Sequence, residues 1–100
     1  MNMWKIKIHR LVIDEDFKKI SAHDQSIILK TLRKKLSLSP EKYDAPLRHN
    51  LKGFRKLKIS DYRVIYKIEK EAIKVLVVKV GLRKDEKVYK EMMQRIKKLP

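Results

Sequence analysis

Hydrophobic and polar residues alternate along four short stretches of the chain, and alternation with a period of two is typical of a half-buried β-strand. The first stretch covers residues 3–9, where apolar and basic side chains alternate. The others are residues 54–59, 62–68 and 72–80, of which the last is apolar enough to be a central strand. In the third stretch, one face collects four side chains with large apolar surfaces: Tyr62, Val64, Tyr66 and Ile68. The pattern predicts one strand at the start of the chain and three in its second half.

A helical period replaces the alternation between residues 13 and 36. Three acidic residues at positions 14–16 suit the positive end of a first, short helix. Ser21 with Asp24 three residues later is a capping pattern, so a second helix is predicted from there to the residues before Pro40. Its apolar side chains repeat at helical spacing: Ile28, Leu32 and Leu36. We expect the two helices to form a hairpin.

The rest of the chain contributes a long connection and a final helix. Residues 39–53 hold two prolines and a glycine without a clear period and are interpreted as an ordered connection. After Gly81, four apolar residues are spaced for an amphipathic helix: Val88, Met92, Ile96 and Leu99. The predicted order βααβββα indicates an α+β fold, a small antiparallel-rich sheet packed against a helical hairpin, with a C-terminal helix. The length of 100 residues and the lack of an internal repeat predict that residues 1–100 form a single domain.

Charge changes this picture most, because 27 Lys and Arg against 12 Asp and Glu give a formal net charge of +15. Residues 1–46 carry 10 basic and 6 acidic side chains (+4), whereas residues 47–100 carry 17 and 6 (+11). A polyanionic partner is the default inference from such a balance. The chain has no cysteine, and no apolar run approaches the ~20 residues that span a bilayer. We expect a cytoplasmic protein without membrane association.

Conventional active-site chemistry finds little support in the sequence. The carboxylates are scattered over helix starts and turns, where capping and solubility explain them. The three histidines are isolated and lack metal-ligand spacing: His9, His23 and His49. Two glycines, Gly53 and Gly81, are too few for a phosphate-binding loop. We therefore expect neither a metal ion nor a cofactor.

What remains is a group of cations with one tyrosine: Arg48, Lys52, Arg55, Lys56, Lys58, Arg63, Arg83 and Tyr89. Such a group is either a solvated basic surface or a site for RNA. RNA carries its own nucleophile, the 2′-hydroxyl, so cleavage needs only deprotonation of that hydroxyl, stabilisation of charge at phosphorus and help for the departing 5′-oxygen. Crowded cations lower one another's pKa, so a lysine among arginines can act as a base, while arginine binds phosphate oxygens in bidentate geometry.

Four segments then resemble, in order and spacing, the RelE family of ribosome-dependent mRNA endonuclease toxins: "LR" at 47–48, "RKLKISDYRVIYKI" at 55–68, "VLVVKVGLRKDEKVY" at 75–89 and "MMQRI" at 92–96. The resemblance extends over residues 3–97 and is most specific from residue 47 onward. It implies a toxin of a type II toxin–antitoxin pair that cleaves mRNA in the ribosomal decoding (A) site, without metal, by transesterification at the 2′-hydroxyl. The implied partners are the ribosome with its mRNA and a cognate acidic antitoxin similar to RelB.

The family's catalytic pattern implies a role for each matching residue. Lys56 and Lys58 would activate the 2′-hydroxyl and stabilise charge. Arg63 would bind the transition-state phosphate, and Arg83 would serve the phosphate and the leaving oxygen. Tyr89 would stack on a nucleotide or orient it; the alternative for Tyr89 is a place in the core beside its apolar neighbour.

Three further basic residues are assigned to RNA binding. Arg48 matches an RNA-contacting position of the family, whereas Lys52 and Arg55 are assigned on charge and proximity alone. Two alternatives remain open for the whole chain. The "YRVIY" core at 62–66 is shared with ParE-like gyrase poisons, so the chain can instead be a DNA gyrase inhibitor without RNase activity. It can also be an inactive relative that binds RNA or antitoxin.

Overall fold

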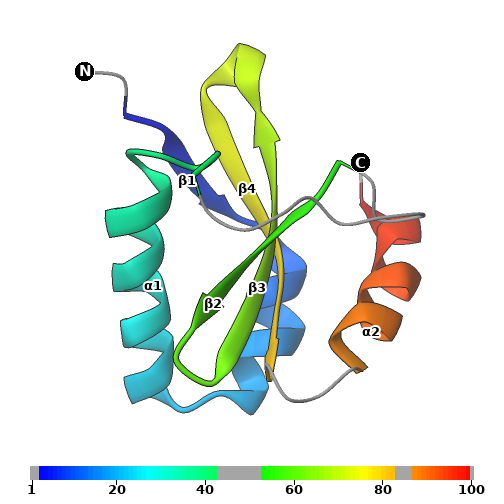
Figure 1. The fold of residues 1–100 in the computed structure, drawn as a ribbon. Helices are drawn as coiled ribbons and strands as arrows, with labels where there is room; N and C mark the ends of the chain where they lie inside the picture. Colours follow the sequence, from blue (N-terminus) through cyan, green and yellow to red (C-terminus); the bar gives the residue numbers. More distant parts are fainter. Residues whose placement is uncertain (1–2, 43–52, 83–86, 100) are drawn as a thin grey trace.

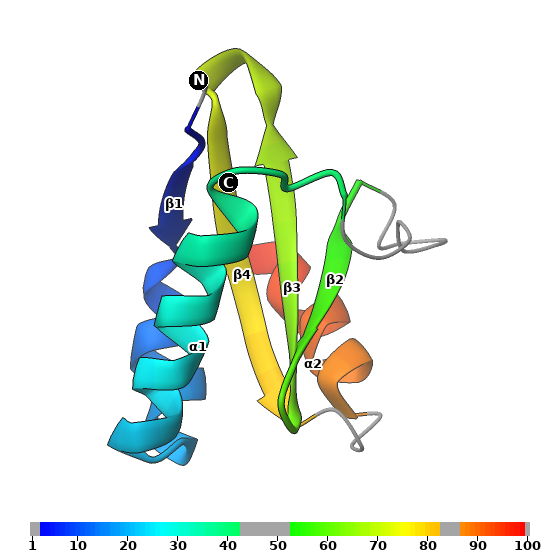
Figure 2. The ribbon, with the colours of Figure 1, turned by 60° about the vertical axis from the view of Figure 1, so that its left-hand side comes forward.

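A computed structural model describes residues 3–42, 53–82 and 87–99 of the chain. The described residues form a sheet of four strands: β1 (Lys5–Ile8), β2 (Arg55–Ile59), β3 (Tyr62–Glu69) and β4 (Lys74–Leu82). The order across the sheet is β1-β4-β3-β2; Figure 1 labels the four strands, and Figure 2 shows them in this order. β1 runs parallel to β4, and the other neighbouring strands are antiparallel. The four strands predicted from alternation, and the α+β class, are confirmed.

Helices cover both faces of this sheet. On one face lies α1 (Ala22–Leu36), preceded by two short helical turns, η1 (Val12–Asp16) and η2 (Phe17–Lys19). On the other face lies α2 (Lys87–Arg95), and Figure 2 shows the sheet between α1 and α2. Two 3₁₀ turns complete the described elements: η4 (Lys70–Ala72) and η5 (Ile96–Lys98). No helix among the described residues is long and apolar enough to cross a membrane.

The first predicted helix is present, but its geometry is not that of a regular α-helix. η1 is a π-helical turn, in which the N–H of Phe17 donates to the carbonyl of Val12, and η2 is a 3₁₀ turn. A π turn joins residues five apart, so it carries one more residue than an α-helical turn. Val12 and Phe17 both reach the core in this way, and Asp16 between them is buried as well.

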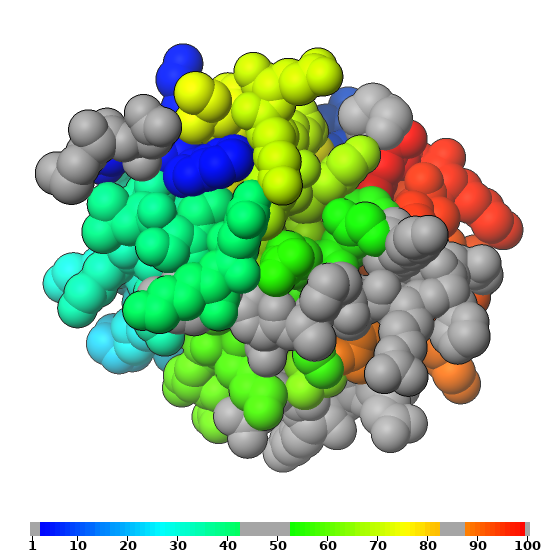
Figure 3. Space-filling model, turned by 45° about the horizontal axis from the view of Figure 1, so that its top comes forward, coloured from blue at the N-terminus to red at the C-terminus, as the bar shows by residue number. Residues whose placement is uncertain are grey.

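α1 begins where the capping pattern predicts, because Ser21 Oγ accepts a hydrogen bond of 3.2 Å from the backbone N–H of Asp24. The carboxylate of Asp24 accepts a hydrogen bond of 2.6 Å from the Tyr62 hydroxyl, which joins the start of α1 to the β2–β3 hairpin. This bond, together with burial, raises the pKa of Tyr62 to about 12. At the other end of α1, the N–H of Trp4 donates to the Ser37 carbonyl at 2.7 Å. Figure 3 shows the start of β1 (blue) beside the end of α1 and the start of β4 (yellow).

The sheet separates two hydrophobic cores. The larger core lies against α1 and includes the face of β3 that alternation predicts to be apolar; its fully buried members include Val12, Ile28, Leu32, Leu36, Val64, Tyr66, Val75 and Val77. The smaller core lies under α2 and consists of Phe54, Ile65, Val78, Val88 and Met92. α2 is shorter than its predicted apolar stripe: Ile96 lies in a 3₁₀ turn and Leu99 in an extended segment, although both still pack against this core.

β4 contains a β-bulge that changes the face on which its side chains lie. Ile65 of β3 pairs with Lys79 while Tyr66 pairs with Val77, so Val78 has no partner on β3. Val77 and Val80 therefore both face the core against α1, and Lys79 turns toward α2. Simple alternation would have placed Lys79, instead of Val80, in the larger core.

Candidate functional site

Three cations of the β2–β3 hairpin lie on the face of the sheet that carries α2. Lys58 of β2 is directly opposite Arg63 of β3, and Lys56 is opposite Ile65, which belongs to the core under α2. Lys58 is exposed, whereas Lys56 and Arg63 are half-buried. Like charges directly opposite one another destabilise a sheet, so the hairpin carries this arrangement at a cost in stability.

Tyr89 of α2 lies against Arg63. Arg63 Nη1 donates a hydrogen bond of 2.5 Å to the Tyr89 hydroxyl, and the guanidinium carbon is 5.3 Å from the centre of the phenol ring. The second distance lies within the ~6 Å range of cation–π attraction. Arg63 Nε is buried and has no hydrogen-bond partner among the described residues. The pair fixes the guanidinium beside the phenol, and we call Lys56, Lys58, Arg63 and Tyr89 the hairpin site.

The close approach of α2 to β4 depends on Gly81. A Cβ atom at this position would lie 2.5 Å from Cγ2 of Val88, in the first turn of α2. The φ angle of Gly81 is not positive, so the small size of the glycine matters here and not its conformational freedom. Because Tyr89 directly follows Val88, this contact also sets how near Tyr89 comes to the sheet.

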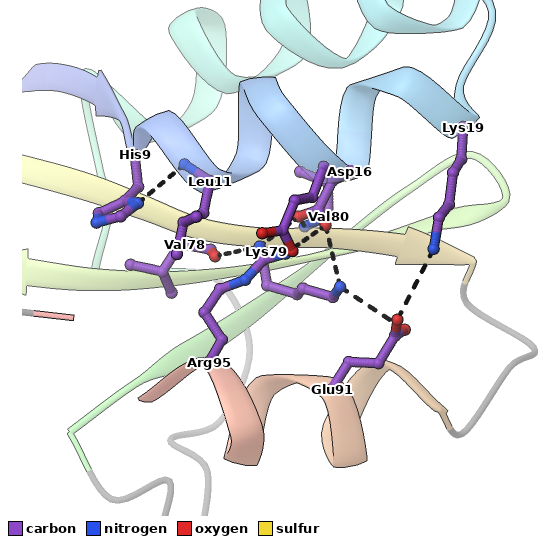
Figure 4. Close-up of polar contacts among 10 residues, drawn as sticks. His9, Leu11, Asp16, Lys19, Val78, Lys79, Val80, Glu91 and Arg95 are labelled. Atoms are coloured by element: carbon purple, nitrogen blue, oxygen red, sulfur yellow. Dashed lines mark hydrogen bonds and ion pairs between the residues drawn. The ribbon is translucent and has the colours of Figure 1, made fainter. Parts of the chain in front are cut away.

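A group of buried charges that the sequence analysis did not predict joins α2 to η1 and β4 (Figure 4). Its members are Asp16, Lys79 and Arg95, which are all buried, and we call them the clasp. The Arg95 guanidinium binds both carboxylate oxygens of Asp16, at 2.7 and 2.8 Å. Lys79 Nζ donates to Asp16 Oδ1 at 3.0 Å. One carboxylate therefore holds a strand and a helix together.

The clasp also satisfies backbone groups of β4. β1 pairs with β4 only as far as Val77, so beyond that residue no strand among the described residues lies beside this edge of β4. Asp16 accepts a hydrogen bond of 2.8 Å from the N–H of Val80, and Arg95 donates one of 3.0 Å to the carbonyl of Val78. Buried backbone groups without partners are costly, and these two side chains take the place of the missing strand.

Two glutamates at the surface add negative charge around the clasp. Glu15 accepts a hydrogen bond of 3.1 Å from Arg95, and a carboxylate oxygen of Glu91 is 3.6 Å from Lys79 Nζ. Burial by itself would lower the pKa of Arg95, but the hydrogen bonds and charge of Asp16 and then Glu15 outweigh it and raise that pKa. The acidic side chains around Arg95 therefore favour the charged form of its guanidinium.

The sequence contains a signal for two of the three clasp residues. Lys79 interrupts an otherwise apolar strand, and Arg95 falls on the apolar side of the final helix. A charge at a position that the pattern assigns to the core indicates a buried partner. Asp16 carries no such signal, because an acidic residue at a helix start is already explained by the helix dipole.

Arg55, another predicted site residue, does not lie on the same face of the sheet as the hairpin site. Arg55 shares a face of β2 with Leu57, opposite to Lys56, and donates a hydrogen bond of 3.1 Å to the carbonyl of Glu41. Alternation itself predicts this placement, because neighbouring residues of a strand face opposite ways. Three predicted site residues lie outside the described residues: Arg48, Lys52 and Arg83.

The hairpin site offers the chemistry of clustered cations beside a tyrosine. A cavity of about 330 Å³ lies beside the clasp, and no residue of the hairpin site lines it. Among the described residues, no three His, Asp or Glu side chains are grouped so that they could hold a metal ion. Lysine and arginine at the hairpin site can attract an anionic polymer and stabilise extra negative charge, and a neutral lysine can accept a proton.

Comparison with known proteins gives these features a context. The sequence model of the ParE toxins of type II toxin–antitoxin systems, parDE, matches residues 4–87. A RelBE toxin–antitoxin complex from Mycobacterium tuberculosis has a structure similar to this chain, with a TM-score of 0.76 and 24% identity over 85% of this chain and 97% of that one. A mutant of the E. coli toxin RelE in the free state gives a TM-score of 0.73 and 23% identity over 94% and 98% of the two chains.

The same E. coli mutant in complex with an antitoxin peptide, RelBc, gives a TM-score of 0.67 and 26% identity over 92% and 95% of the two chains. At these identities the solved structures show a shared fold. No curated protein matches the sequence significantly.

Proposed function

This chain belongs to the family of ParE toxins of type II toxin–antitoxin systems, within the RelE/ParE superfamily, and we propose that it is a toxin of the RNA-cleaving kind. The proposed activity is that of a ribosome-dependent endoribonuclease, an mRNA interferase, which cleaves mRNA in the decoding (A) site without metal. The observation that supports it is the hairpin site, which gathers two lysines, an arginine and a tyrosine on one face of the sheet.

In the proposed reaction, Lys56 or Lys58 in its neutral form accepts the proton of the 2′-hydroxyl, and the 2′-oxygen attacks the adjacent phosphorus. The bond from phosphorus to the 5′-oxygen breaks, that oxygen takes up a proton, and a 2′,3′-cyclic phosphate remains. Arg63 stabilises the charge added to the phosphate oxygens. Tyr89, held by Arg63, offers its ring to a nucleotide base. Arg83 is proposed to bind the phosphate and the leaving oxygen.

Dependence on the ribosome has a physical reason beside the family resemblance. Lysine and arginine side chains attract RNA by charge, but charge alone does not hold RNA in line for attack. A substrate already held in reactive geometry converts a bimolecular encounter into an effectively unimolecular step. Three further residues are proposed to add RNA contacts: Arg48, Lys52 and Arg55. Of these, Arg55 would do so from the opposite face of the sheet.

We propose a cognate acidic antitoxin, similar to RelB, as the partner of this chain. Two of the similar solved structures are complexes of a toxin with an antitoxin or an antitoxin peptide. The net charge of +15 favours an acidic binder, because complementary charge speeds association. Expression with the adjacent open reading frame should restore growth and yield a complex that co-purifies. Failure of both would contradict this partner.

Inhibition of DNA gyrase without RNA cleavage is the second candidate function, and the match to the ParE family favours it. The two candidates make different demands on the hairpin site. Gyrase inhibition needs binding alone, whereas RNA cleavage needs a proton acceptor and a cation at the phosphate.

Incubation of the purified chain with programmed ribosomes, followed by mapping of the mRNA ends, tests the proposal. We expect cuts at the A-site codon. Arg63→Ala should lower the single-turnover rate by about 10²–10³-fold, the usual effect of removing one transition-state donor. Lys67→Ala is the matched control, because Lys67 is an exposed cation on the same face of β3, and its rate should stay within about twofold of the original.

Two outcomes would count against the proposal. Equal rates for Arg63→Ala and the original chain would remove the hairpin site from the mechanism. Uncut mRNA, together with inhibited supercoiling in a parallel gyrase assay, would replace RNA cleavage with the second candidate.

A further inference from the structure

We propose that Arg95, through the clasp, is a positioning residue that sets the rotation of α2 about its own axis and so holds Tyr89 against Arg63. Tyr89 is the third residue of α2 and Arg95 the last. Six residues of helix separate them by about 9 Å along the axis, so Arg95 acts at a distance from the hairpin site. The consequence for catalysis rests on the proposed function, whereas the geometric part of the inference rests on contacts within this chain.

The contacts of α2 lie on three sides of the helix. Val88 and Met92 face the sheet and belong to the core beneath the helix. At about 100° per residue, Tyr89 lies on one flank of this stripe and Glu91 on the other. Tyr89 meets Arg63 of β3 on its flank, and Glu91 is 3.6 Å from Lys79 of β4 on the opposite flank.

Apolar packing over Gly81 sets how closely α2 approaches β4, but it constrains the rotation of the helix less. The apolar arc of α2 is wide, because Met93 and the ring of Tyr89 continue it beyond Val88 and Met92. Met93 is 43% exposed in the observed rotation. A roll of the helix toward that flank would bury Met93 and lift Val88, and hydrophobic burial is non-directional, so it discriminates poorly between the two arrangements.

Arg95 fixes the rotation of α2 through directional hydrogen bonds. Its planar guanidinium binds both oxygens of Asp16 and the carbonyl of Val78, and these hydrogen bonds weaken steeply when their angles change. Asp16 cannot follow the helix, because it is itself held by Lys79 and by the N–H of Val80. The side chains of Asp16 and Arg95 are only 3% and 5% exposed, so water does not readily replace the lost bonds.

A surface ion pair between the same parts of the fold provides the contrast. Lys19 of η2 lies 4.0 Å from Glu91 of α2, with 77% and 47% of the two side chains exposed. Exposed pairs of this kind contribute little. Removing Lys19 therefore deletes a cation that faces α2 without touching the clasp.

The decisive variant is Arg95→Lys, which keeps the buried positive charge but cannot bind two carboxylate oxygens in one plane. Arg95→Gln removes the charge as well, and Lys19→Gln is the matched control. Nuclear magnetic resonance of protein with isotope-labelled arginine and tyrosine follows the Arg63 Nε–H group and the Tyr89 ring directly. Cleavage of mRNA on programmed ribosomes gives kcat and KM for each variant.

We expect Arg95→Lys to shift and broaden the Arg63 and Tyr89 signals while signals from the core against α1 keep their positions. Its kcat should fall by about 10- to 100-fold, as expected for a misplaced group, and its KM should change much less. Lys19→Gln should match the original chain in every measurement.

Unchanged Tyr89 signals in folded Arg95→Lys would overturn the inference. If Arg95→Gln does not fold, Arg95→Lys decides alone, and loss of the whole fold in both would replace the positioning role with a structural one. If the original chain cuts no mRNA, the resonance measurements still decide whether the clasp positions Tyr89, and only the catalytic consequence falls with the proposed function.

Discussion

Replacement of Gly81 by alanine tests how closely α2 must approach β4. The new Cβ would lie 2.5 Å from Cγ2 of Val88, whereas carbon atoms in favourable contact are about 3.5–4.0 Å apart. Val88 is β-branched and buried, so relief requires α2 to move by roughly 1 Å, together with Tyr89. Overpacking of this kind costs about 1–3 kcal/mol, and alanine recovers only about 0.5–1 kcal/mol by restricting the unfolded chain. The cost of overpacking is larger than this gain, so we expect the free energy of unfolding to fall by about 1–2 kcal/mol.

Thermal and urea unfolding measure the effect. In a domain of this length, 1–2 kcal/mol corresponds to a fall in Tm of roughly 4–16 °C. Val88→Ala removes the methyl group that the new Cβ meets, although by itself it leaves a small cavity. In the Val88→Ala background, Gly81→Ala should therefore be neutral or slightly stabilising, so the two substitutions should couple by about 1–3 kcal/mol.

Additivity of the two substitutions would refute this reasoning, since the predicted cost arises from one pair of atoms. A Gly81→Ala variant as stable as the original chain would refute it as well. Tyr89 provides an independent check, because movement of α2 should also weaken its hydrogen bond to Arg63, which the tyrosine resonances report.

Three other predictions concern the two hairpin lysines, Tyr62 and His9. Single Lys56→Ala and Lys58→Ala variants should lose part of the cleavage rate, and the double variant should lose more than either, because neighbouring cations share one phosphate environment. A double variant that cleaves mRNA on programmed ribosomes as fast as the original chain would contradict this. The Tyr62 hydroxyl donates to Asp24, and its pKa is raised to about 12. The stability that this bond supplies should therefore be complete below pH 10 and be lost as the pH rises toward 12. Unfolding of Tyr62→Phe beside the original chain over this pH range measures the effect. The pKa of His9 is lowered from 6.5, first by burial, so the unfolded chain binds the proton more readily. The free energy of unfolding should therefore fall as the pH drops below 6.5. The same pH dependence of unfolding for the original chain and His9→Gln would contradict this.

The strands, the capped helix and the superfamily could be predicted from sequence because their signals are local. Alternation places Tyr62 and Val64 on one face of β3, and the structure puts both against the larger core. Ser21 begins α1 through a bond to a residue three positions away. The family match confirms the resemblance to RelE/ParE toxins. The resemblance could be recognised from sequence because its motifs are short segments with fixed spacing.

The candidate site could be predicted only in part. Lys56, Lys58 and Arg63 gather on one face because strand alternation and a tight hairpin determine that face, and Tyr89 joins them from α2. Charge and proximity group Arg55 with them, but a neighbouring residue on a strand points the other way.

Tertiary structure alone decided the bulge at Val78, the π turn of η1 and the clasp. The clasp depends on partners far apart in the sequence: Asp16 lies 63 positions from Lys79 and 79 from Arg95, which it binds. Local propensity cannot express such a pairing, because a buried charge is stable only when a distant partner and its hydrogen bonds are in place. Charge and spacing determined which residues gather at the hairpin site, whereas long-range contacts decided how α2 packs on the sheet and where Tyr89 therefore lies.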